Sequence, residues 1–428
     1  MKYTKLHTNK LVRFSLFIFL YLYLFGPNLK VIDFMYVAVF LSFLSYFVLR
    51  IKLYSLDSKL IYVTISTFPI LFYSLFLLII GDESQFVIEI SKFIIFIIST
   101  FGVVNLYVFF CKDDWKTELI QDIVIASLVV AFTTIIIFMI PSVKEIVLDI
   151  VNFKMADNIQ VIKGIRGIDI SVGGGTALSI VFFLGVVLSK TLYFWNYRNS
   201  YLNSISFYIF AIAALITART GFLLIIFILL ISWCITLFGK TFNIKVSTKV
   251  LRKHFYLNSV IFLLFSIFVV LHFNELLFDI LLPWALEMFI NASDNGFSSE
   301  STNDLISNHY NVAISEMTYL FGGGSFFIQS DVGLIKVLSS VGILGALLLG
   351  LPLTLLPFYV LSSRVLYQKL SFEYMLCFSV FFVWFIIFLV NFKELFFSNS
   401  RGAFLLFLLI SVVSFTPLRR KCSVHNFI

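Results

Sequence analysis

Twelve long apolar segments, separated by short polar links, leave this 428-residue chain few ways to fold. A helix needs about 20 predominantly apolar residues to cross a bilayer, and in lipid each backbone polar group must be satisfied internally. The pattern therefore predicts an all-α polytopic membrane protein with about 12 transmembrane helices. The predicted spans are residues 12–27, 34–50, 60–80, 87–110, 119–140, 173–191, 202–217, 221–239, 256–274, 333–360, 372–392 and 402–417. The span at 333–360 is long enough to tilt strongly.

Basic residues are divided unequally between the two sides that these spans define. The links on the side of the N-terminus hold 21 of the 31 lysines and arginines, eight lie on the other side, and Lys92 and Lys336 lie within spans. Basic residues remain on the cytoplasmic side of a membrane, so we expect both termini in the cytoplasm.

Composition excludes several classes of protein. The chain is 60% hydrophobic and 13% charged, roughly half the charged fraction of an ordinary soluble domain. The net charge of +8 is explained by the sidedness of the basic residues, so no nucleic-acid partner is predicted. The N-terminal apolar run lacks a small-residue cleavage site and is expected to be an uncleaved span. The four cysteines show no paired spacing, so we expect neither a disulfide nor a metal site, and no cofactor.

We treat residues 1–428 as a single integral membrane domain with two long external loops. The first, 142–172, contains the amphipathic sequence SVKEIVLDIVNF and then VIKGIRGIDISVGGG. The second, 275–332, begins with ELLFDILLPWALEMFI, which is typical of a helix lying in the interface. It continues with a helical pattern, LISNHYNVAISEMTYLF, and then GGGSF, and it holds eight acidic residues but no Lys or Arg.

Three arginines lie on the external side, where positive charge is otherwise scarce. Arg219 stands between two spans with almost no loop, Arg166 precedes the glycine run 173–175, and Arg401 follows a polar turn. Each can extend to the lipid headgroups, which is the simpler interpretation for Arg401. The alternative is that their planar guanidinium groups bind phosphate, beside glycines and a helix N-terminus that favour anions. The short turn at Arg219 favours phosphate binding there.

The acid–base candidates lie in the second loop. His309 and Glu316 are separated by two helical turns, which would place them on one face of a helix. Asp331 directly precedes an apolar span, where it is either a helix cap or a base for a sugar hydroxyl. Tyr310 and Tyr319 are candidates for stacking on sugars, although interfacial aromatic residues need no such role.

Few unpaired charges lie in the middle of the spans, the main ones being Glu89, Lys92 and Lys336. Ion-coupled carriers commonly place ionisable residues at this depth. The pattern therefore favours a site at the outer membrane edge over a transporter.

Three segments resemble the bacterial O-antigen and capsular polysaccharide polymerases (Wzy-type), within the wider O-antigen ligase and polymerase family. They are TARTGFL, the loop in which Arg166 is followed by a glycine-rich helix entry, and YLFGGGSF followed by SDVGLIKVLSSVGILGALLLG. The last is similar to the family's Gly-x-Gly, Asp-x-Gly and Gly-x-x-Gly sequence. The layout resembles the family over nearly the whole chain, whereas the motifs cover about 60 residues.

The resemblance implies a GT-C-like fold in the bacterial inner membrane and a glycosyl transfer at the periplasmic face. A growing glycan linked to undecaprenyl pyrophosphate would move onto an incoming lipid-linked repeat unit, without a metal. The implied partners are these lipid-linked oligosaccharides, membrane lipids, a chain-length regulator and a flippase. Arg219 and Arg166, with Arg401 as a third cation, would then bind pyrophosphate, and Asp331, His309 or Glu316 would act on the acceptor.

The chain departs from the family at two places. Many relatives carry an arginine where His309 stands, and ligases tend to carry His-Asn where this chain has Ser330-Asp331. The second difference favours a polymerase over its alternative, an O-antigen ligase that transfers glycan to lipid A core. A lipid-linked oligosaccharide flippase is the alternative from another class.

Overall fold

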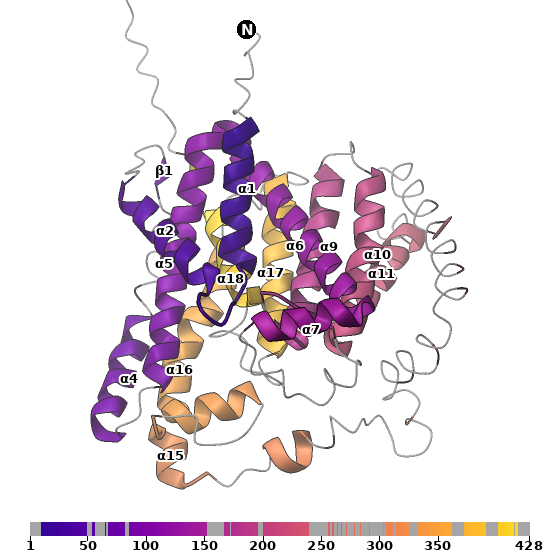
Figure 1. The fold of residues 1–428 in the computed structure, drawn as a ribbon. Coiled ribbons are helices and arrows are strands. Elements are labelled where there is room, and N and C mark those ends of the chain that lie inside the picture. The colour runs from indigo at the N-terminus through magenta and orange to yellow at the C-terminus, as the bar shows by residue number, and fades with distance from the viewer. Residues whose placement is uncertain are drawn as a thin grey trace, which may run out of the picture.

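The computed structural model is an all-α bundle (Figure 1). It describes residues 10–48, 54–55, 67–81, 85–151, 167–171, 173–195, 200–238, 305–310, 314–324, 332–361, 372–390, 401–414 and 416–417, with residue 65 and isolated residues between 256 and 303. Arg166, Asp331 and most of the interfacial segment that begins the second long loop lie outside these residues.

Each predicted span coincides with a helix, except 256–274, of which only isolated residues are described. The helices are α1 (Lys10–Phe25), α2 (Phe34–Val48), α4 (Phe68–Gly81), α5 (Gln85–Cys111), α6 (Trp115–Met139), α7 (Pro141–Ile150), α9 (Thr176–Trp195), α10 (Ser200–Thr217), α11 (Arg219–Phe238), α15 (Glu316–Phe321), α16 (Gly333–Leu361), α17 (Phe372–Val390) and α18 (Arg401–Ser414). Two helical turns, η1 (Lys112–Asp114) and η5 (Leu305–Tyr310), and the strands β1 (Tyr54–Ser55), β2 (Ile168–Asp169), β3 (Gly173–Gly174) and β4 (Thr416–Pro417) complete the described elements.

Three helices of the described part are long and apolar enough to cross a membrane, namely Phe86–Cys111, Trp115–Met139 and Gly333–Gly350. Six shorter apolar helices accompany them: Phe34–Ser45, Phe68–Ile79, Thr176–Leu192, Ile205–Thr217, Leu376–Val390 and Phe404–Val413. Large apolar side chains such as Phe40, Phe72 and Ile79 are exposed on the surface of the bundle. Exposed side chains of this size suit contact with lipid, and these features together indicate a multi-pass membrane protein.

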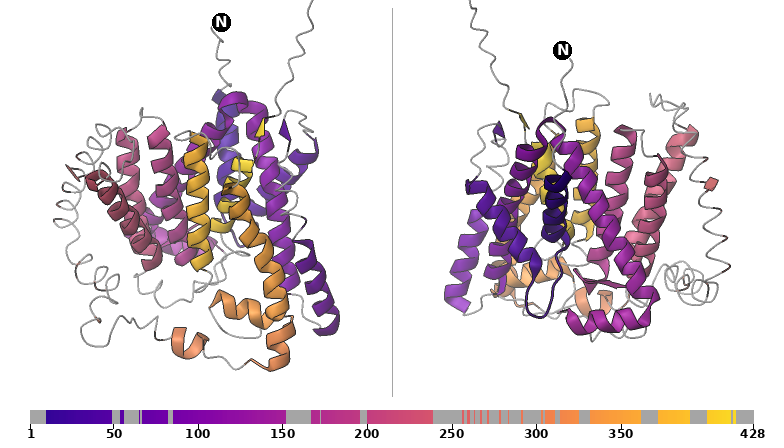
Figure 2. Two further views of the ribbon diagram at one scale, coloured as in Figure 1. Left: turned by 180° about the vertical axis from the view of Figure 1, so that it is seen from behind. Right: turned by 45° about the horizontal axis from the view of Figure 1, so that its top comes forward.

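The helices give the bundle two distinct ends. Arg13 at the start of α1 contacts Glu118 at the start of α6, and β1, after α2, pairs with β4, after α18. We call this end the N-terminal face. At the opposite end the link between α1 and α2 contacts the β2–β3 hairpin through Asn28 N–H and the Ile170 carbonyl (3.2 Å), and we call that end the hairpin face. In Figures 1 and 2, α7 lies across the bundle at the hairpin face.

Small residues and hydroxyl groups join the helices inside the bundle. A Cβ at Gly102 of α5 would meet the Ser42 carbonyl oxygen of α2 at 1.9 Å, so only glycine allows this approach. The hydroxyl groups of Thr100 and Ser411 lie 2.7 Å apart and connect α5 with α18. Close backbone contact and interhelical hydrogen bonds are the usual means of association between helices in lipid, where burial of apolar surface gives little driving force.

Helix α16 is 29 residues long, and it is interrupted by a kink. Gly342 has φ +63° and ψ −173°, and the helix changes direction there (Figure 1). The chain after α15 completes the break, because the N–H groups of Gly323 and Gly324 donate to the carbonyls of Ser339 and Ser340, each at 2.8 Å. These carbonyls lie in the last turn before the break, where a helix lacks its own donors.

Candidate functional site

The β2–β3 hairpin is held in place by a buried carboxylate, Asp169. Its Oδ1 accepts a hydrogen bond from the Thr133 hydroxyl of α6 at 2.6 Å. Its Oδ2 accepts from the backbone N–H (3.0 Å) and the hydroxyl (2.5 Å) of Ser171. Only 1% of Asp169 is exposed, and a buried carboxylate needs such donors because loss of hydration is otherwise uncompensated. The turn is therefore fixed to the bundle.

The chain entering the hairpin is also bonded to the end of α10. The Gly167 N–H donates to the Ile216 carbonyl at 2.7 Å. A Cβ at position 167 would lie 3.2 Å from the Ile216 side chain and 3.3 Å from that of Thr134, so the space suits glycine. Ala218 is the single residue between α10 and α11, and it is buried. The hairpin is thus attached three residues before Arg219, which begins α11.

The helices that follow these two segments begin side by side. Gly175, with φ +74°, turns the chain from β3 into α9. Two residues into α11, Gly221 packs against α9, because a Cβ there would meet the Ser179 carbonyl oxygen at 2.4 Å. The N–H groups in the first turn of a helix have no partner within the helix and carry partial positive charge. Two neighbouring helix N-termini and a glycine strand therefore lie together at the hairpin face, and their N–H groups are of the kind that suits an anion.

The structure describes two of the three arginines that were predicted to bind pyrophosphate. Arg219 and Arg401 are the first residues of α11 and α18, and both helices begin at the hairpin face. Arg166 precedes Gly167 in sequence but lies outside the described residues, as does Asp331. Arg219 therefore lies near the hairpin segment only through its neighbours in the chain, because Ile216, three residues earlier, accepts the hydrogen bond from Gly167.

The candidates of the second loop lie on separate helical segments. His309 and Tyr310 belong to η5, whereas Glu316 and Tyr319 belong to α15. Ser315 lies between them in extended conformation and caps α15, its Oγ accepting from the Thr318 N–H at 3.2 Å. The expectation that His309 and Glu316 share one helical face is therefore wrong, because a capped helix starts after Ser315.

The side chains of these candidates also differ in exposure. Glu316, Tyr310 and Tyr319 are exposed, and His309 is half-buried. The segment after α15 is anchored to α4, since the Tyr73 hydroxyl donates to the Phe321 carbonyl at 2.7 Å. These contacts fix α15 on α4 and α16, while the roles of the four residues in catalysis and sugar stacking stay predictions.

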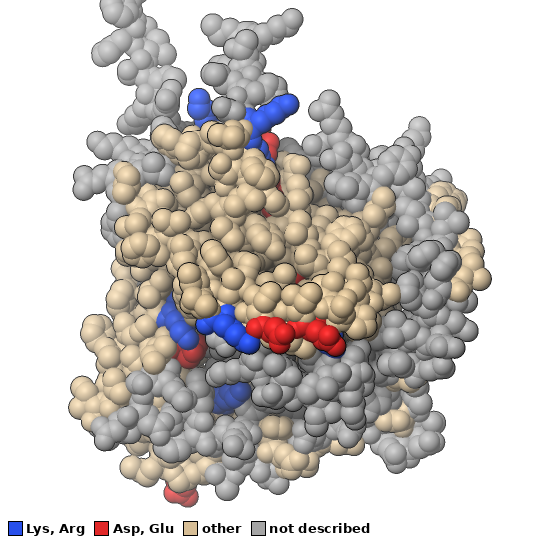
Figure 3. Space-filling model, viewed as in Figure 1, with Lys and Arg blue, Asp and Glu red and all other residues tan. Residues whose placement is uncertain are grey.

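Charged side chains also gather on α7 at the hairpin face. Glu145 and Asp149 are exposed one helical turn apart, and acidic atoms line the outer edge of this helix (Figure 3). Burial lowers the pKa of the Lys144 ammonium below its ordinary value. An arginine, unlike a lysine, keeps its full charge when it is buried to this extent.

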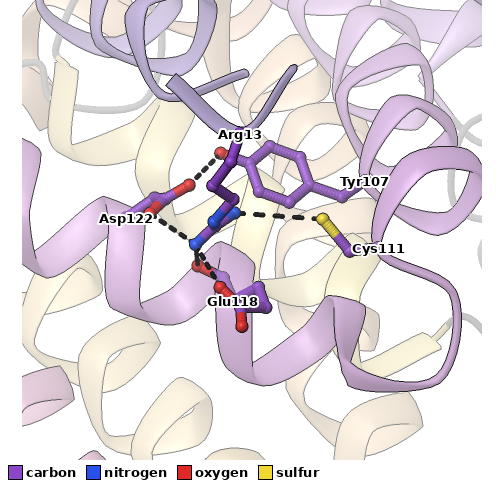
Figure 4. Close-up of polar contacts among 5 residues, drawn as sticks. All are labelled: Arg13, Tyr107, Cys111, Glu118 and Asp122. Atoms are coloured by element: carbon purple, nitrogen blue, oxygen red, sulfur yellow. Dashed lines mark hydrogen bonds and ion pairs between the residues drawn. The ribbon is translucent and has the colours of Figure 1, made fainter. Parts of the chain in front are cut away.

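A second polar cluster lies at the N-terminal face (Figure 4). Arg13 of α1 donates to Asp122 Oδ1 at 2.7 Å and forms an ion pair with Glu118, both on α6. The Tyr107 hydroxyl of α5 donates to Asp122 Oδ2 at 2.6 Å, and the Arg13 guanidinium lies 3.9 Å from Cys111 Sγ. The cluster joins three helices and is internally hydrogen bonded, which indicates a structural ion pair.

Sequence reasoning missed the partners in both clusters. Asp122 lies in a span that is strongly apolar overall, and the sidedness of basic residues already explains Arg13, so the sequence does not indicate an ion pair between them. Asp169 lies in the polar segment GIRGIDISVGGG, where the sequence gives no sign that its carboxylate is buried. Of the charges expected to be unpaired, Lys92 instead pairs with Glu89 at 3.0 Å.

Comparison of the chain with known protein families, with curated proteins and with solved structures finds no match.

Proposed function

We propose that the protein is a polysaccharide polymerase that joins oligosaccharide repeat units linked to undecaprenyl pyrophosphate. The observation that carries this proposal is the close approach of the N-termini of α9 and α11, with Arg219 at the start of α11 and Gly173–Gly174 before α9. The N-terminus of a helix binds phosphate readily, and an adjacent arginine adds two parallel hydrogen bonds.

The membrane arrangement supports the same proposal. With the N-terminal face in the cytoplasm, the basic links lie inside and the hairpin face lies in the periplasm. A lipid-linked pyrophosphate would then reach the anion-binding surface at the edge of the outer leaflet. The twelve-span topology and the inner membrane of a bacterium are parts of this proposal.

The reaction needs groups that stabilise the negative charge developing on the pyrophosphate as it leaves. A sugar hydroxyl of the incoming repeat unit attacks the anomeric carbon of the growing glycan. The bond from that carbon to the pyrophosphate oxygen breaks, and its electron pair leaves with the pyrophosphate. Donors fixed where this charge develops stabilise the transition state. Arg219 and the two helix N-termini supply such donors, and the hydroxyl proton passes to a base, for which Asp331 and His309 are the candidates.

Two alternatives use the same lipid-linked substrate. An O-antigen ligase would transfer the glycan to lipid A core, and incubation with that acceptor alone separates it from a polymerase. A flippase or transporter is favoured by the buried ion pair between Arg13 and Asp122, because charges within helices often mark transport pathways. That pair is already satisfied by protein groups, which supports the structural interpretation.

The test is a gel of surface polysaccharide from a deletion strain that carries the gene on a plasmid. We expect Arg219→Ala to leave a core band with one repeat unit and to abolish the ladder of longer chains. Lys10→Gln is the matched control, since it removes an exposed positive charge at the N-terminal face, and it should keep the ladder. A full ladder with well-expressed Arg219→Ala would overturn the proposal for this residue. Loss of each repeat-bearing band in the deletion strain would favour the ligase or the flippase.

A further inference from the structure

Asp169 connects the two segments that end in the proposed anion-binding surface. In the hairpin register Asp169 is opposite Gly173 and Ile168 is opposite Gly174. The strand after the turn leads directly into α9. The strand before the turn begins next to Gly167, whose N–H bonds to Ile216 near the start of α11. A movement of Asp169 would therefore change the position of the glycine strand relative to both helix N-termini.

The carboxylate is fixed by groups from within the bundle. Thr133 lies on α6, and its hydroxyl lies 2.6 Å from Asp169 Oδ1 and 2.9 Å from the Val130 carbonyl. The other carboxylate oxygen is occupied by Ser171. Since Asp169 is 1% exposed, it is enclosed by the protein, not presented to a substrate.

We infer that Asp169 is a positioning residue, which holds the glycine strand 173–174 in place beside the helix N-termini where the proposed function puts the pyrophosphate. This inference rests on the proposed function and adds to it the residue that sets the geometry of the anion site. The hydrogen bonds of Asp169 are what matters, and its negative charge is not needed for the chemistry.

The role of hydrogen bonding can be separated from the role of charge. In Asp169→Asn the amide oxygen can accept from Ser171 while the amide NH₂ donates to the Thr133 hydroxyl. Thr133 then donates to the Val130 carbonyl, which already lies within reach. The asparagine variant can therefore satisfy each contact, whereas Asp169→Ala removes all of them and Thr133→Val removes the contact with α6.

Thr134 offers a matched control on the same helix. Its hydroxyl donates to the Val130 carbonyl at 2.8 Å, and its methyl group faces Gly167. Thr134→Val keeps that methyl group and the buried volume, and it leaves the Asp169 hydrogen bonds intact. A loss shared by Thr133→Val and Thr134→Val would reflect the stability of α6 and not the position of the hairpin.

The experiment measures binding of inorganic pyrophosphate to the full-length protein purified in detergent, together with its unfolding temperature without ligand. The polysaccharide ladder is recorded in cells. We expect Asp169→Ala and Thr133→Val to bind pyrophosphate about tenfold more weakly, the effect of losing one strong hydrogen bond, and to make shorter ladders. Asp169→Asn and Thr134→Val should remain within about twofold of the wild type. Each affinity is calculated for the folded fraction of the protein, so that weaker binding is not confused with a loss of stability.

Each other result decides against the positioning role alone or against both proposals. If the wild type binds pyrophosphate, Arg219→Ala does not, and Asp169→Ala and Thr133→Val bind as the wild type does, the positioning role is wrong and the proposed function stands. If Asp169→Asn is as weak as Asp169→Ala, the charge is required and the positioning role is also wrong. If the wild type does not bind pyrophosphate, the anion site fails, and the inference about Asp169 fails with it. If Asp169→Ala does not fold, the comparison of Thr133→Val, expected to bind weakly, with Asp169→Asn, expected to bind normally, still tests the positioning role.

Discussion

Gly221 of α11 lies so close to Ser179 of α9 that a Cβ at position 221 would stand 2.4 Å from the Ser179 carbonyl oxygen and 2.5 Å from its Cβ. The contact joins the first turns of two helices that are about 40 residues apart in sequence. Arg219 is two residues before Gly221, so the same contact determines where the start of α11 lies relative to the glycine strand. The glycine that allows this packing thus also determines the geometry of the candidate site.

Gly221→Val should separate α11 from α9. The obstructing atoms are the backbone and the Cβ of Ser179, which cannot rotate away, so the helices must shift. Overpacking of this kind costs about 1–3 kcal/mol of unfolding free energy. We expect a lower unfolding temperature in detergent and a polysaccharide ladder shortened beyond what the loss of protein explains.

Gly350 provides the control for this substitution. It lies in α16, and a Cβ there would meet no atom within 4 Å. Gly350→Ala should be neutral or stabilise the protein by up to about 1 kcal/mol, because alanine favours the helix. Equal damage from Gly221→Val and Gly350→Ala would show that the close contact with Ser179 has no special importance.

The break in α16 gives a second prediction. Gly342 has a conformation that is nearly restricted to glycine, and a Cβ there would lie 2.3 Å from the Leu320 carbonyl oxygen. Gly342→Ala should therefore destabilise the protein by about 1–3 kcal/mol and release the chain after α15 from the break. Limited proteolysis should cut this chain faster in the variant. Unchanged cleavage and stability would mean that the bend does not depend on Gly342.

The course of the helices was largely predictable, because it follows from the length and spacing of apolar segments. The predicted span at 87–110 agrees with α5 at Gln85–Cys111, and that at 202–217 agrees with α10 at Ser200–Thr217. The break at Gly342 was not predictable from hydropathy, since the residues on both sides are equally apolar. It depends on the chain at Gly323–Gly324, which supplies the missing donors from outside the helix.

The candidate site was predictable only in part. A turn of one residue fixes Arg219 at the beginning of α11, and the sequence TART-GFLL showed this turn directly. The hydrogen bond between Gly167 and Ile216 is a tertiary contact with no local signal. Asp169 could not be distinguished from an exposed loop aspartate, because its burial depends on Thr133 from a different helix. Local sequence patterns thus located Arg219, but not the tertiary contacts of Gly167 and Asp169 that position the hairpin beside it.

The ion pair at the N-terminal face gives the last prediction. The side chain of Asp122 is 5% exposed and that of Arg13 is 24% exposed, so removal of Arg13 leaves a buried carboxylate beside Glu118. Loss of one partner of a buried ion pair costs about 3–5 kcal/mol, and the partial exposure of Arg13 favours the lower limit. Arg13→Gln should therefore lower the unfolding temperature clearly, whereas Lys10→Gln, one helical turn earlier and exposed, should change it little.

The double variant Arg13→Gln with Asp122→Asn separates a structural ion pair from a transport site. Replacement of both charges by amides removes the unpaired carboxylate, and side chains in contact commonly show coupling energies of about 0.5–3 kcal/mol. We expect the double variant to be more stable than Arg13→Gln alone and to keep the polysaccharide ladder, since a structural pair has no role in chemistry. A double variant that is as stable as the wild type but exports no repeat unit would contradict this expectation. Charge at Arg13 and Asp122 would then serve passage through the membrane, and the flippase alternative would replace the polymerase.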